Sequence, residues 1–132
     1  MSHSVPPQLL AIVDDLFMQS RIDAAAEATG VAVRYVHTAD DIRAAVAERP
    51  ARALLVGMAA TRRPWPAVVQ ALRADPNPAM AGLYVLAFGP HMNLTLRQQA
   101  LDAGVNRVVA NSAFVRLLPT ILATPTADVP DE

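Results

Sequence analysis

The sequence predicts an α/β fold in which a doubly wound, five-stranded parallel sheet is flanked by five helices. Three observations support this prediction: short apolar runs recur along the chain, each run is followed by a segment with helical spacing, and no repeat or linker interrupts the alternation. Wholly apolar runs are typical of strands buried on both faces, as in parallel sheets. Right-handed crossovers favour the strand order 2-1-3-4-5, with a topological switch point between the first and third strands.

The first unit begins with a strand over residues 9–13, which are all apolar and which end at the acidic pair Asp14 and Asp15. Apolar residues then recur near helical spacing over residues 16–28. Gly30 follows where a left-handed glycine would end a helix. The chain therefore opens with a complete strand–helix unit.

The second unit begins with a β-rich strand over residues 31–36. Thr38 offers a helix N-cap, and Asp41 completes a capping box before a helix over residues 42–47. Pro50 ends this helix, because a proline disfavours helical geometry in the residue before it.

The third strand covers residues 53–56 and closes at Gly57. A helix is predicted over residues 65–74, where apolar residues recur at helical spacing and prolines lie in the first turn. An Asp-Pro-Asn-Pro segment breaks it. The fourth strand follows over residues 83–88.

The fourth helix is predicted over residues 94–103, where Asn93 can cap its start and Gly104 ends it. Residues 108–110 form the fifth strand.

Ser112 can cap a last helix over residues 113–123, which Pro119 should split or kink. The chain is therefore expected to comprise an N-terminal extension, one domain and a flexible C-terminal tail, over residues 1–8, 9–123 and 124–132.

Composition limits the possible functions. The 132 residues include 11 basic and 12 acidic side chains, for a net charge of −1, so we expect no binding to nucleic acid or to an anionic membrane. All basic residues are arginines and cysteine is absent, which excludes chemistry that needs a lysine amine or a thiolate. No phosphate-binding glycine loop or nucleophile elbow occurs. We therefore expect no enzymatic activity, no cofactor and no metal.

No signal-peptide pattern and no apolar run long enough for a membrane span occurs in the sequence. The absence of cysteine is compatible with a reducing compartment. We expect a cytoplasmic protein.

Two motifs in order resemble those of a known family. Residues 12–15, Ile-Val-Asp-Asp, resemble the acidic end of the first strand in response-regulator receiver domains, which have a flavodoxin-like fold. Residues 100–105, Ala-Leu-Asp-Ala-Gly-Val, resemble the end of the helix before their fifth strand. The similarity covers residues 9–123.

The resemblance implies where a receiver's chemistry would lie. Receivers transfer a phosphoryl group to an aspartate that ends the third strand, with Mg²⁺, a lysine after the fifth strand and a hydroxyl after the fourth. In this chain, Gly57 stands at the position of the acceptor aspartate and Gly89 at the position of the hydroxyl residue. Asn111 stands at the position of the lysine. No acidic residue occurs over residues 49–73, so a shift of register does not restore the acceptor. The sequence thus resembles a pseudo-receiver.

Asp14 and Asp15 remain as a residual acidic pocket. They either keep a divalent cation or are satisfied by backbone amides, arginine or water. We favour the second interpretation, because a hard cation needs several oxygen ligands and the third-strand carboxylate is missing. Arg62 and Arg63, in the loop after the third strand, could compensate the paired negative charges.

The resemblance implies a stand-alone, phosphorylation-independent pseudo-receiver that acts in two-component signal transduction through protein–protein interaction. Receivers use the surface of their fourth helix, fifth strand and fifth helix for partners and for homodimers, and here this surface corresponds to Leu94–Leu122. The alternative is a small-ligand sensor with a strand-end crevice around Gly57 and Gly89. A true phospho-receiver with an unexpected acceptor is the third hypothesis.

Overall fold

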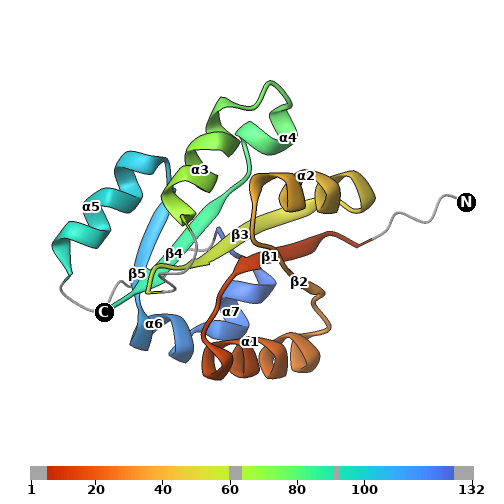
Figure 1. Cartoon of the computed structure of the whole chain (residues 1–132). Coiled ribbons are helices and arrows are strands. Elements are labelled where there is room, and N and C mark those ends of the chain that lie inside the picture. Colours follow the sequence, from red (N-terminus) through yellow and green to blue (C-terminus); the bar gives the residue numbers. More distant parts are fainter. Residues whose placement is uncertain (1–5, 60–63, 91–92, 127–132) are drawn as a thin grey trace, which may run out of the picture.

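The computed structural model describes residues 6–59, 64–90 and 93–126, which form a sheet with helices on both faces (Figure 1). The strands are β1 (Gln8–Ile12), β2 (Val33–Tyr35), β3 (Ala51–Gly57), β4 (Val85–Gly89) and β5 (Arg107–Ala110). The helices are α1 (Leu16–Thr29), α2 (Ala39–Glu48), α3 (Trp65–Ala74), α4 (Pro78–Ala81), α5 (Leu94–Ala103), α6 (Asn111–Arg116) and α7 (Leu118–Ala123).

The sheet has the predicted topology. Its five strands are all parallel and lie in the order β2-β1-β3-β4-β5. The connections run through helices, as parallel pairing requires. The predicted fold class is therefore confirmed.

The alternating direction of the strand side chains divides the core into two layers. In β1, Leu10 and Ile12 join the apolar cluster beneath α2, α3, α4 and α5. Leu9 and Ala11 join the cluster beneath α1, α6 and α7 on the opposite face. Figure 1 shows these two groups of helices on either side of the sheet. The apolar runs within the strands are therefore explained by burial on both faces.

The caps predicted for α1, α2 and α5 are confirmed. Gly30 and Gly104 end α1 and α5 with φ values of 71° and 111°, a region that glycine enters without a Cβ penalty. Thr38 and Asp41 form the capping box of α2. The side chain of Asn93 accepts the N–H of Leu96 at 3.0 Å and caps α5.

The first strand begins one residue before the predicted boundary. The side-chain amide of Gln8 donates hydrogen bonds to the carbonyls of Ala45 and Arg49, both at 3.0 Å, and Gln8 is 4% exposed. Its backbone N–H also donates to the carbonyl of Pro50 at 2.9 Å. A polar residue thus begins β1 because it satisfies the carbonyls around the end of α2.

Two details of the helices differ from the prediction. The segment predicted only as a break contains the short helix α4, whose N-cap is Asn77. The last helix begins at Asn111 with Ala110 as its N-cap, so the proposed cap at Ser112 is wrong. The helix is split at Leu117, and Pro119 lies in the first turn of α7, where its missing N–H costs nothing. The described part of the chain therefore has seven helices where five were expected.

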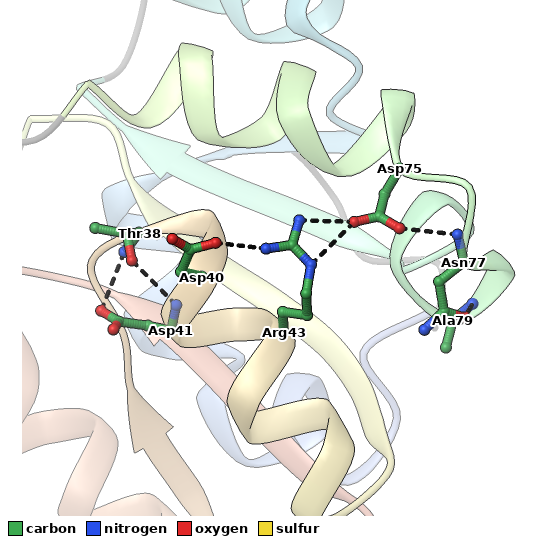
Figure 2. Close-up of polar contacts among 7 residues, drawn as sticks. All are labelled: Thr38, Asp40, Asp41, Arg43, Asp75, Asn77 and Ala79. Carbon is green, nitrogen blue, oxygen red and sulfur yellow. Dashed lines mark hydrogen bonds and ion pairs between the residues drawn. The ribbon is translucent and has the colours of Figure 1, made fainter.

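A polar clamp holds α2 against the end of α3 (Figure 2). The guanidinium of Arg43 donates to the carboxylate of Asp75, with 2.8 Å between Nη2 and Oδ2, and also pairs with Asp40. Asp75 accepts the N–H of Asn77 at 2.8 Å in the turn that leads into α4. The hydrogen bond from the side chain of Arg43 is the main reason that the pKa of Asp75 is lowered. The clamp fixes the spacing of three helices on one face.

Arg73 anchors the C-terminal end of α5. It donates to the carbonyls of Gly104, Ala81 and Leu83 at 2.7 to 2.9 Å, and to the side chain of Asn106 at 2.7 Å. A Cβ on Gly104 would lie 2.8 Å from the Cγ of Arg73, so only glycine allows this approach. Arg73 thereby ties α3 to the turn between α5 and β5.

None of the helices in the described part of the chain has the length and apolarity of a membrane span. Most of the tail that was predicted to be flexible lies outside the described residues, which end at 126.

Candidate functional site

The predicted site positions lie together at the carboxyl edge of the sheet. Gly57 ends β3 and pairs in register with Phe88, while Gly89 ends β4 and pairs in register with Ala110. Asn111 follows β5 directly. The backbone thus assembles the frame of a strand-end site at the topological switch point.

No acceptor side chain exists at the end of β3, and the adjacent space is filled. Gly57 is buried, and a Cβ placed on it would lie 3.2 Å from Cζ and 3.3 Å from Cε2 of Phe88. Such distances are shorter than ordinary van der Waals contact. The ring of Phe88 therefore borders the space that a larger side chain at position 57 would enter.

Phe88 is held in this position by a second aromatic ring. The rings of Phe88 and Phe114 stack with their centroids 3.8 Å apart and their planes at 11°. Phe88 is 3% exposed and Phe114 is fully buried. Because both rings are enclosed by the core between the sheet and α1, α6 and α7, Phe88 has little freedom to move away from Gly57.

Gly89 is covered in a similar way from the other core layer. A Cβ on Gly89 would lie 2.7 Å from Cε of Met58, which is 4% exposed. The N–H of Met58 donates to the carbonyl of Phe88 at 2.9 Å and extends the pairing of β3 with β4 beyond Gly57. The space beside both glycines is therefore taken by apolar side chains of the protein itself.

Asp15 caps the first helix. Its Oδ1 accepts the backbone N–H groups of Phe17 at 2.8 Å and Met18 at 3.3 Å. These amides would otherwise lack partners in the first turn of α1. These hydrogen bonds agree with the interpretation that backbone amides satisfy Asp15. An aspartate directly before a helix is a common N-cap, so the sequence could have revealed this role.

Asp14 is half-buried between β1 and α1, and its Oδ2 is shielded from solvent. Arg62 and Arg63, the two arginines predicted to compensate the acidic pair, lie outside the described residues. Their role stays a prediction.

The acidic pair does not fit a magnesium site of the receiver type. Mg²⁺ prefers near-octahedral oxygen ligands, and in receivers one of them comes from the residue at the end of the third strand. That position is Gly57, and an oxygen of Asp15 is engaged by α1. Among the described residues, no group of three or more histidine or acidic side chains is placed to hold a metal ion.

The sequence reasoning missed the residues that close this edge, namely Phe88, Met58 and Phe114. Only the cross-strand register reveals them, because Gly57 and Phe88 are far apart in the chain.

Comparison with known proteins supports the fold but adds no sequence-level match. No protein-family model matches the chain, and neither does any curated protein. Among solved structures, a response regulator from Hahella chejuensis matches with a TM-score of 0.73 and 13% identity, over 93% of this chain and 99% of that one.

Two further structures match over similar lengths. A response regulator in red light signalling of R. palustris has a TM-score of 0.70 and 18% identity, over 96% of this chain and 100% of that one. The receiver domain of a sensor histidine kinase from Pseudomonas aeruginosa, which has a magnesium ion in its active-site cleft, has a TM-score of 0.69 and 21% identity. That match covers 89% of this chain and 95% of the kinase's domain. The chain therefore has the receiver fold.

We expect Gly57→Asp to lower the free energy of unfolding by at least about 2 kcal/mol, because the new carboxylate enters a buried apolar space and displaces the ring of Phe88. Gly57→Ala is the matched control, since it adds the Cβ without the charge, and it should cost less. Urea unfolding measures both. An aspartate variant with the parent's midpoint would contradict the packing described here.

We expect Asp15→Asn to change the free energy of unfolding by less than about 0.5 kcal/mol, because asparagine caps a helix as well as aspartate does. Asp15→Ala should cost about 1 kcal/mol, because it leaves the amides of Phe17 and Met18 without this acceptor. Urea melts compare the two variants. A loss of more than about 2 kcal/mol in Asp15→Asn would mean that the ionised carboxylate pairs with a buried cation instead.

Proposed function

We propose that this protein is a pseudo-receiver that works in signal transduction without being phosphorylated, by binding protein partners. It catalyses no reaction itself. The single observation that carries this proposal is the filled end of β3, where Gly57 replaces the acceptor and Phe88 lies 3.2 Å from the position of a Cβ. Two further positions agree with it, since Gly89 offers no switch hydroxyl and Asn111 no ammonium.

The receiver fold supports a role in signalling, because the solved structures that match include response regulators and the receiver domain of a sensor kinase. The surface proposed for binding is that of Leu94–Leu122, formed by α5, β5, α6 and α7. It includes Leu94 and Leu101, which are 69% and 42% exposed.

The alternative of a small-ligand sensor receives less support. That hypothesis needs an open crevice around Gly57 and Gly89. The described neighbours of these glycines, Phe88 and Met58, already occupy the space beside them. A ligand placed directly beside these glycines would have to displace Phe88 or Met58.

The proposal is tested by incubating the whole chain with acetyl phosphate and Mg²⁺ and measuring its intact mass. We expect no gain of a phosphoryl group, because no carboxylate stands at the end of β3. A receiver with an acceptor aspartate, treated in parallel, shows that the donor is active. An acid-stable, Mg²⁺-dependent phosphoryl adduct on one carboxylate would overturn the proposal and favour the hypothesis of an unexpected acceptor.

A further inference from the structure

A hollow of about 280 Å³ lies at the amino edge of the sheet, the edge opposite the predicted site. Its lining residues come from α2, from α4, from the start of β3 and from the turn that leads into β4. Helices α2 and α4 lie side by side on this face of the sheet (Figure 1). The volume is close to the lower limit of small-ligand sites and equals that of roughly nine water molecules, at ~30 Å³ each.

The lining of this hollow combines apolar residues with one charged side chain. The apolar residues include Val46, Pro50, Pro78 and Leu83. Arg52 is the single charged residue that lines the hollow within the described part of the chain, and it is exposed. An occupant of the hollow therefore contacts an apolar wall and a positive charge at the same time.

The guanidinium of Arg52 is available to a ligand. Among the described residues it has no hydrogen bond or ion pair, whereas Arg34 pairs with Glu48 and Arg43 with Asp75. An arginine presents five N–H donors in a planar fork that matches a carboxylate in bidentate geometry. The charge and the shape of this group therefore favour a carboxylate as its partner.

The walls of the hollow are held in place by contacts within the chain. Arg73 donates to the carbonyls of Ala81 and Leu83, at 2.8 and 2.7 Å, and thereby fixes the turn between α4 and β4. The pair of Arg43 and Asp75 joins α2 to the turn that leads into α4 (Figure 2). A preformed site loses less conformational entropy on binding than one that must first be ordered.

From this arrangement we infer that the hollow binds a small carboxylic acid with a branched apolar body, whose carboxylate pairs with Arg52 while its hydrocarbon part lies against Val46 and Leu83. This site is independent of the proposed function, which places protein partners on another surface. The ion pair is partly exposed and the apolar contact is small, so the affinity is expected in the millimolar range.

Two other occupants share part of this chemistry. Inorganic phosphate would match the guanidinium of Arg52, but it would leave the apolar wall uncovered. The C-terminal leucine of a peptide carries both a carboxylate and a branched apolar group, but the rest of the peptide would need contacts outside the hollow. A free small acid satisfies both parts of the lining within the available volume.

The test is a titration of the whole, isotopically labelled chain with isovalerate, followed through its backbone amide signals by NMR. We expect saturable shifts of the residues around the hollow. Arg52→Gln should weaken binding about fivefold, because it removes the charge of the ion pair. Ala79→Leu should also weaken it, because a larger side chain enters the lining. The matched control, Arg21→Gln, removes an exposed arginine of α1 on the opposite face and should leave the affinity unchanged.

Isopentanol separates the role of the charge from that of the apolar wall, because it keeps the branched body and lacks the carboxylate. Equal binding of isopentanol and isovalerate, or the absence of saturable shifts around the hollow, would overturn the inference. Tighter binding of phosphate would replace the acid with an anion alone. Tighter binding of the peptide Ala-Ala-Leu than of isovalerate would assign the hollow to a protein terminus instead. Urea midpoints confirm that the variants fold.

Discussion

The packing of Phe88 between Gly57 and Phe114 determines what the carboxyl edge of the sheet can do. A parallel sheet brings the ends of β1, β3 and β4 together, and in open α/β folds this edge is the usual place for a ligand. Here an aromatic ring 3.8 Å from a second ring occupies the space beside the third strand. The described ends of β3 and β4 are therefore part of the core.

The proposed function places partner binding on the outside of the fold, because no acceptor side chain stands at the end of β3. Burial of the strands on both faces positions α5 beside β5, and Arg73 fixes the end of α5 through four hydrogen bonds.

Local patterns predicted the fold because strands and helix caps depend on residues that are close in the sequence. Apolar runs indicated the strands, and Thr38 with Asp41 indicated the start of a helix. The absence of a side chain at Gly57 was also readable, because it needs no coordinates. The filling of that space by Phe88 was not readable, because it depends on the register of β3 with β4. The cap proposed at Ser112 failed because α6 begins directly after β5.

A double-mutant cycle on Phe88→Leu and Phe114→Leu tests most directly whether stacked rings close the strand-end site. The free energies of unfolding of both single variants, the double variant and the parent are obtained from urea melts. Stacking predicts a coupling energy of about 1 kcal/mol, because either single change removes the same ring contact. Single effects that add to within about 0.3 kcal/mol would contradict the account, since the two rings would then stabilise the protein independently.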